Sequence, residues 1–138
     1  KVEKETKKED AQESLCMEVA ECVTELMNAA TSFHKLHLKV TGQGSFASHS
    51  TLKIYEDFHD FSDQLSEEFQ GAYGEILTYK EVLPRTLNTK QDGIIYLQDL
   101  KTMITELQGK LPYSEIINDL DLCKSKINGA LYKLKFLS

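Results

Sequence analysis

Residues 48–79, SHSTLKIYEDFHDFSDQLSEEFQGAYGEILTY, decide the fold class of this chain. Apolar side chains recur in this stretch every three or four residues, which is the spacing of one face of an α-helix. The stripe consists of Ile54, Phe58, Phe61, Leu65, Phe69, Ala72 and Ile76. We predict one long amphipathic helix over this stretch, with its phenylalanines in the core. Gly71 and Gly74 lie within the pattern and predict either a kink or the close approach of another backbone.

Three other segments have helical periodicity and complete a set of four helices. Residues 14–40 carry two neighbouring apolar stripes, so we expect this helix to contact two neighbours. Residues 92–111 predict a third helix, which Gly109 and Pro112 end. A fourth begins at Ser114, with acidic residues early and lysines late, as the helix dipole favours.

The connection between the second and third helices leaves the topology of the bundle open. Residues 81–91 contain Pro84 and have only weak periodicity. When fully extended they reach about 36 Å, whereas a 20-residue helix is about 30 Å long. Both a plain up-down-up-down bundle and a bundle with a crossover connection satisfy these lengths.

Composition places the chain among ordinary globular proteins with one domain. It has 138 residues, of which 41% are apolar and 28% charged, and only seven glycines and two prolines. Turn residues are too few for a β-sandwich or barrel, so the class is all-α. We predict a polar N-terminal tail over residues 1–13 and a four-helix bundle domain over residues 14–138. Three cysteines are an odd number and do not predict a disulfide framework.

Charge and hydropathy also exclude several classes of partner. No stretch approaches the roughly 20 apolar residues of a membrane-spanning helix, so we expect no membrane partner. The first ten residues contain equal numbers of lysines and acids. The net charge is −6 and the isoelectric point about 5.2, so the chain lacks the excess of cations that neutralises phosphates. We therefore predict no nucleic-acid binding. The first 15 residues are too polar for the apolar region of a secretory signal, so we also expect an intracellular protein.

Short motifs around the first interhelical loop resemble a known family. They are His34-Lys35-Leu36-His37, Ser45-Phe46-Ala47-Ser48-His49, Tyr55-Glu56-Asp57 and Glu68-Phe69-Gln70-Gly71-Ala72-Tyr73-Gly74. These motifs resemble the small ferritin-like proteins of tailed bacteriophages, which are similar to the Dps branch of the ferritin superfamily. The resemblance implies an all-α, ferritin-like four-helix bundle that forms closed homo-oligomers. It also implies a location in the host cytoplasm or the virion, where other virion proteins would be partners.

The sequence departs from the Dps pattern at its acidic positions. A histidine that closes the first helix and another that opens the second are matched by His37 and His49. The acidic residue expected four positions after the second histidine is replaced by Lys53. The later acidic pair falls on Gln64 and Glu68 in a strict alignment. It falls on Asp63 and Glu67 if one residue is deleted.

Spacing provides a separate argument about metal binding. Glu56, Asp60, Asp63 and Glu67 recur at four, three and four residues, so they share one helix face opposite the phenylalanines. Carboxylates with imidazoles suit iron or another divalent ion, and Glu56-x-x-His59 resembles half of a di-iron site. A complete site in one bundle needs a second such element, and no histidine follows His59.

Two interpretations of this acidic face are left. One is a metal site shared between subunits, with His37 and His49 from one chain and Asp63 and Glu67 from another. The other, which we prefer, is a solvated acidic face without bound metal. The functional hypotheses follow the same division. The preferred one is a non-catalytic assembly or interaction subunit that self-associates. The alternative is a ferroxidase-like protein that binds iron between subunits and oxidises it with oxygen or peroxide.

Overall fold

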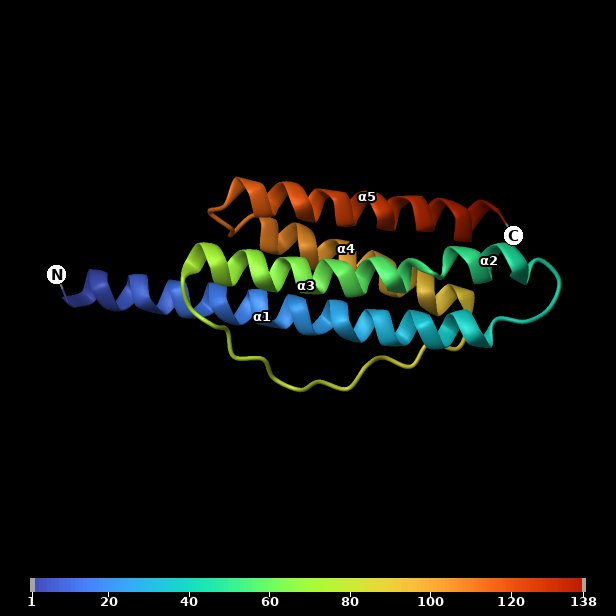
Figure 1. The fold of residues 1–138 in the computed structure, drawn as a ribbon, viewed down its shortest axis with the longest axis horizontal. Coiled ribbons are helices and arrows are strands. Elements are labelled where there is room, and N and C mark those ends of the chain that lie inside the picture. Colours follow the sequence, from blue (N-terminus) through green and yellow to red (C-terminus); the bar gives the residue numbers. More distant parts are fainter. Residues whose placement is uncertain (1, 138) are drawn as a thin grey trace.

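The computed structural model describes residues 2–137, with side chains from Lys7 onward. It contains α1 (Val2–Lys39), α2 (Ser45–Thr51), α3 (Ile54–Tyr73), α4 (Lys90–Gln108) and α5 (Ser114–Phe136), and no strand within residues 2–137. The four long helices pack side by side as a bundle, and α2 is a short helix at one end (Figure 1). The prediction of an all-helical fold is confirmed.

Helix α1 is longer than the periodicity indicates. It begins at Val2, well before the predicted start at Ser14, and its N-terminal turns project beyond the other helices (Figure 1). Side chains from Lys7 to Ser14 are exposed, whereas the buried stripe starts at Val19. Hydrophobic periodicity detects only the part of a helix that packs against a partner, so this exposed extension gave no signal. As predicted, α1 contacts two long helices, α3 and α4.

The helix predicted over residues 48–79 is interrupted near its start and ends before residue 79. Leu52 and Lys53 interrupt it and separate α2 from α3. Its C-terminal end comes at Gly74, where φ is 91° and the main-chain N–H bonds to the Gln70 carbonyl at 2.9 Å. This left-handed glycine ends the helix, so Ile76 leaves the core stripe and is 81% exposed. Of the two alternatives predicted at Gly71, the close approach of another backbone is excluded, because a Cβ there would meet no atom within 4 Å.

The connection from α3 to α4 is a crossover. Residues 74–89 run back along the bundle without helical structure, so α3 and α4 run parallel (Figure 1). The connection is longer than the predicted 81–91 because α3 ends early. Side chains of α1 hold it by donating hydrogen bonds to its carbonyls: Asn28 to Val82 (2.8 Å), Ser32 to Arg85 (2.7 Å) and Lys39 to Leu87 (3.0 Å).

Aromatic rings join three helices at the centre of the core. The Phe33 ring of α1 lies 5.5 Å from the Phe58 ring of α3 and 5.5 Å from the Tyr96 ring of α4, between ring centroids. All three side chains are fully buried. Near them, the start of α4 approaches α1 so closely that a Cβ on Gly93 would lie 3.0 Å from Leu36 Cδ2.

Candidate functional site

Two of the predicted site residues, His37 and His49, form a reciprocal pair where α1 meets α2. Their rings stack with centroids 3.6 Å apart and planes 17° apart. His37 Nδ1 bonds to the His49 carbonyl at 2.5 Å, and His49 Nδ1 bonds to the His37 carbonyl at 2.8 Å. Because a carbonyl oxygen can only accept, both Nδ1 atoms must carry protons. In the neutral rings, Nε2 is therefore the nitrogen with a free lone pair.

This histidine pair closes the loop between the first two helices. His37 is buried, whereas His49 is partly exposed. Tyr55 at the start of α3 packs edge-on against His37, and its ring stacks on His34 with centroids 4.0 Å apart. The four rings hold together the ends of α1, α2 and α3, so the pair has a structural role whether or not it binds a ligand.

The other two predicted site residues, Asp63 and Glu67, lie elsewhere. They are exposed on the outer face of α3, together with Glu56 and Asp60, as the spacing predicted. They follow Ile54 by about 14 Å and 20 Å along the helix axis, which carries them away from the histidine pair. Among the side chains that the structure describes, no three His, Cys, Asp or Glu residues are grouped closely enough to hold a metal ion. One chain therefore does not provide a metal site from these residues.

A partly buried carboxyl pair between α3 and α5, formed by Glu68 and Asp119, was missed by sequence reasoning. Glu68 Oε1 accepts a hydrogen bond from Gln64 Nε2 at 3.1 Å, whereas Glu68 Oε2 is buried without a partner. Two causes raise the pKa of Glu68 above its usual range: burial, which is the larger, and the nearby Asp119 carboxyl. A proton on Glu68 would supply the hydrogen bond to Asp119 that two carboxylates cannot make.

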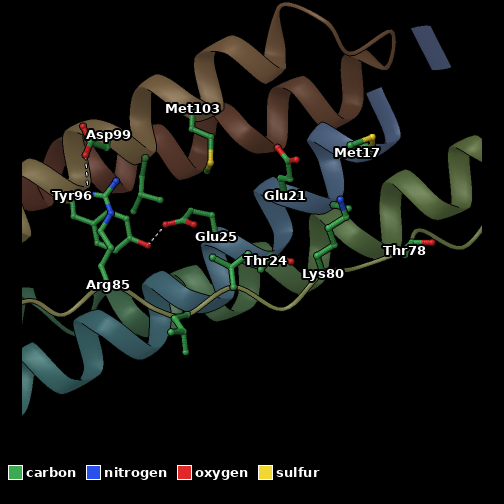
Figure 2. Close-up of a pocket in the computed structure, with 14 residues that line it drawn as sticks. Met17, Glu21, Thr24, Glu25, Thr78, Lys80, Arg85, Tyr96, Asp99 and Met103 are labelled. Carbon is green, nitrogen blue, oxygen red and sulfur yellow. Dashed lines mark hydrogen bonds and ion pairs between the residues drawn. The ribbon is translucent and has the colours of Figure 1, made fainter. Parts of the chain in front are cut away.

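A hollow lies between α1, α4 and the crossover connection, away from the histidines. Its volume is about 530 Å³. Figure 2 shows Met17, Glu21 and Glu25 on the α1 side, Tyr96, Asp99 and Met103 on α4, and Lys80 and Arg85 on the connection. Clefts of 300–1,000 Å³ with mainly apolar walls and few polar groups are typical of small-molecule sites. We refer to this hollow as the crossover groove.

One end of the crossover groove is closed by fixed polar contacts. Arg85 Nη1 bonds to Asp99 Oδ2 at 2.7 Å, and the guanidinium lies 4.2 Å from the centroid of the Tyr96 ring (Figure 2). The Tyr96 hydroxyl donates to Glu25 Oε1. Burial and the neighbouring Glu25 raise the pKa of Tyr96 far above its usual range, so it stays a neutral donor. This end of the groove is therefore polar, and the ion pair within it is about half exposed.

The groove could not be predicted from the residues that line it. Glu21 and Glu25 on α1 read as ordinary exposed positions, and the residues from Thr78 to Arg85 have no periodicity. The groove exists because the connection passes over α1 and α4, and that path depends on the crossover topology. The only usable signal was the connection length, which left the topology open.

Comparison with protein-family models, with curated proteins and with solved structures finds no match to this chain. None of the helices described is both long and apolar enough to cross a membrane.

Proposed function

We propose that this chain is a self-associating, ferritin-like helical-bundle subunit with a non-catalytic role in assembly, encoded by a bacteriophage. Its connectivity supports the proposal, because a bundle with one long crossover connection is an arrangement found in ferritin-like folds. The motifs around His37 and His49 supply the resemblance to the phage proteins. Lys53, exposed at the start of α3, supports the non-catalytic role because it replaces an acidic position of the Dps pattern.

The observation that carries self-association is a set of exposed apolar side chains at the hairpin end of the bundle, where α1 leads into α2; we call this set the apolar surface. Leu38 is 69% exposed at the end of α1, Phe46 is 86% exposed at the start of α2, and Phe136 is 71% exposed at the end of α5. These ends of the three helices lie at the same end of the molecule (Figure 1). Clustered apolar side chains on a surface mark interaction sites.

Charge favours a second copy of the chain as the partner. The outer face of α3 is acidic, through Glu56, Asp60, Asp63 and Glu67, whereas the last turns of α5 carry exposed Lys133 and Lys135. The basic turns lie at the same end as the apolar surface and complement the acidic face of another chain. Electrostatic complementarity of this kind fixes register and excludes wrong partners.

Sedimentation velocity over a series of protein concentrations tests the proposal. We expect the wild-type chain to form an oligomer and Phe46→Ser to weaken association by at least about tenfold, the effect of losing an interface anchor. Leu83→Ser is the matched control, because Leu83 is 91% exposed on the crossover connection, away from the hairpin end. Its association should equal that of the wild type. A monomeric wild-type protein, or equal effects of the two substitutions, would overturn the proposal.

A second candidate function, iron binding between subunits with ferroxidase activity, rests on the histidine pair. A metal-binding histidine usually donates its other ring N–H to a carbonyl or carboxylate. His37 and His49 both have this arrangement, with Nδ1 bound and Nε2 left for a ligand. Their carboxylate partners Asp63 and Glu67 would have to come from a second chain, because one chain does not bring the four together.

Bound iron per subunit after purification with ferrous iron separates the two functions. Stoichiometric iron that is lost in His37→Ala and in Glu67→Ala supports the shared site. His59→Ala is the control, since His59 is an exposed histidine of α3 outside the proposed set. No retained iron in the oligomeric wild type supports the assembly role alone.

A further inference from the structure

The crossover groove has the size and lining of a ligand site rather than of an ordinary surface depression. Its apolar walls come from Met17, Ala20, Val82, Leu83, Leu100 and Met103, and its volume is about 530 Å³. Met17, Val82 and Leu83 are 51%, 55% and 91% exposed, so apolar area is left uncovered along the groove. A ligand with an apolar body would bury this area and gain about 25 cal/mol for each Å² removed from water.

The ionised groups in the groove set the charge of that ligand. Arg85 and Asp99 pair with each other, and Arg85 also lies over the Tyr96 ring, so these two charges largely offset each other within the groove. Glu21 and Glu25 are one helical turn apart on α1, and like charges at this spacing repel each other. Glu25 has one oxygen bonded to Tyr96 and its other oxygen free of recorded hydrogen bonds.

Positive charge in the groove does not fully offset these acids. Among the described residues, the only ion pair with a groove-lining residue is that of Arg85 with Asp99, so Lys80 is unpaired. Lys80 is exposed on the connection and lines the same groove (Figure 2). The lining therefore has an excess of acid, and the two carboxylates on the α1 wall would be stabilised by a cation placed between them and the apolar walls.

We propose that the crossover groove binds a small amphipathic amine, with its apolar body against Met103 and Leu100 and its ammonium group at Glu21 and Glu25. The ammonium would donate to both carboxylates, and the fixed end at Tyr96 would limit the length of the ligand. This binding does not depend on self-association, because the groove is formed within one chain and lies along the bundle rather than at its hairpin end.

Three indole compounds of matched shape test the proposal: tryptamine, which is a cation, tryptophol, which is neutral, and indole-3-propionate, which is an anion. The chain has no tryptophan, so indole fluorescence reports only the probe. Fluorescence anisotropy titrations should show saturable binding in the order tryptamine, tryptophol, indole-3-propionate. We expect at least about a tenfold preference for tryptamine over tryptophol, as charge-assisted hydrogen bonds are worth more than neutral ones.

Variants locate the binding in the groove. Glu21→Gln combined with Glu25→Gln keeps an acceptor for Tyr96 but removes both charges, and should abolish the preference for tryptamine over tryptophol. The control is Glu9→Gln combined with Glu13→Gln, which removes the same charge at the same spacing from the exposed N-terminal part of α1 and should leave the preference unchanged. A filling variant, Thr24→Leu, should weaken binding of tryptamine and tryptophol alike.

Three results would overturn the proposal. They are no saturable binding of tryptamine, equal affinities for the three compounds, or the same loss of preference in the control as in the groove variant. Sedimentation velocity on the same samples keeps the test separate from the proposed assembly role. Tryptamine binding to a monomer would support the groove and count against assembly.

Discussion

Replacing Glu68 with glutamine should stabilise the protein at neutral pH and flatten its pH dependence. The burial of Glu68 between α3 and α5, with Asp119 facing it, raises the pKa of Glu68 above its unfolded value. A raised pKa in the folded state means that the stability from this group is fully present below the unfolded pKa, which is about 4.3. It is lost as the pH rises through the folded pKa. Stability from this site therefore falls from acid toward neutral pH.

The size of the expected stability change follows from Glu68 Oε2, the buried oxygen that has no hydrogen-bond partner. Glu68 Oε2 is buried without a hydrogen bond, and a buried unsatisfied acceptor costs about 1–3 kcal/mol. In Glu68→Gln, the carbonyl oxygen can keep the bond from Gln64 while the amide nitrogen takes the place of Oε2 and donates toward Asp119. We expect a gain of about 1–2 kcal/mol at pH 7.5, equivalent to about 3–7 °C in melting temperature for a chain of this size.

Urea denaturation of both proteins at pH 4.5 and pH 7.5 measures this effect. The difference in unfolding free energy should be present at pH 7.5 and close to zero at pH 4.5. Glu67→Gln, at the exposed neighbouring position, removes the same charge and controls for the net charge of −6. If Glu68→Gln is less stable than wild type at pH 7.5, or its advantage is the same at both pH values, then the explanation by a proton on Glu68 that bonds to Asp119 is wrong.

Three other substitutions and one chemical probe have expected outcomes that thermal melts and thiol titration can check. Gly129→Ala should stabilise by up to about 1 kcal/mol through helix propensity. Gly93→Ala should give no gain or a loss of about 1 kcal/mol, because its Cβ would press on Leu36; equal melting temperatures of the two variants would contradict the close approach. Tyr96→Phe should destabilise by about 1–3 kcal/mol by leaving the carboxylate of Glu25 without its donor. Iodoacetamide at pH 8 should modify partly exposed Cys16 in the native protein and spare Cys123, since burial raises the pKa of the Cys123 thiol to about 12.

The helical class and the core stripes could be predicted because the buried positions of a helix recur every three or four residues as apolar side chains. Phe58, Leu65 and Phe69 are buried as the period required. Apolar spacing predicts the ends of helices less well than their buried faces. Gly74 was interpreted as a kink or contact within a helix because apolar Ile76 continued the period, yet the glycine adopts a left-handed conformation and Ile76 faces solvent. At this position the readiness of glycine to adopt a positive φ decided where the helix ends, although the apolar spacing continued.

The candidate site was predictable only in part, for a related reason. Histidines at the ends of consecutive helices are brought together by the loop that joins them, so the contact of His37 with His49 follows from chain connectivity. The carboxyl pair of Glu68 and Asp119 depends on which helix packs beside α3. That neighbour is α5 because the connection crosses over, and the length of residues 81–91 did not decide the topology.

A stripe of polar residues on α1 explains two features of the fold. It tethers the connection to α1, and it lines the crossover groove. Glu21, Glu25, Asn28, Ser32 and Lys39 follow helical spacing and face the connection. The last three carry donors, and each binds a carbonyl of the connection directly. Ionised carboxylates can only accept, so the two glutamates have no bond to offer those carbonyls. The connection is therefore tethered to α1 between Asn28 and Lys39, whereas beside Glu21 and Glu25 no such bond forms and the two elements line the groove, where these carboxylates can accept from a ligand.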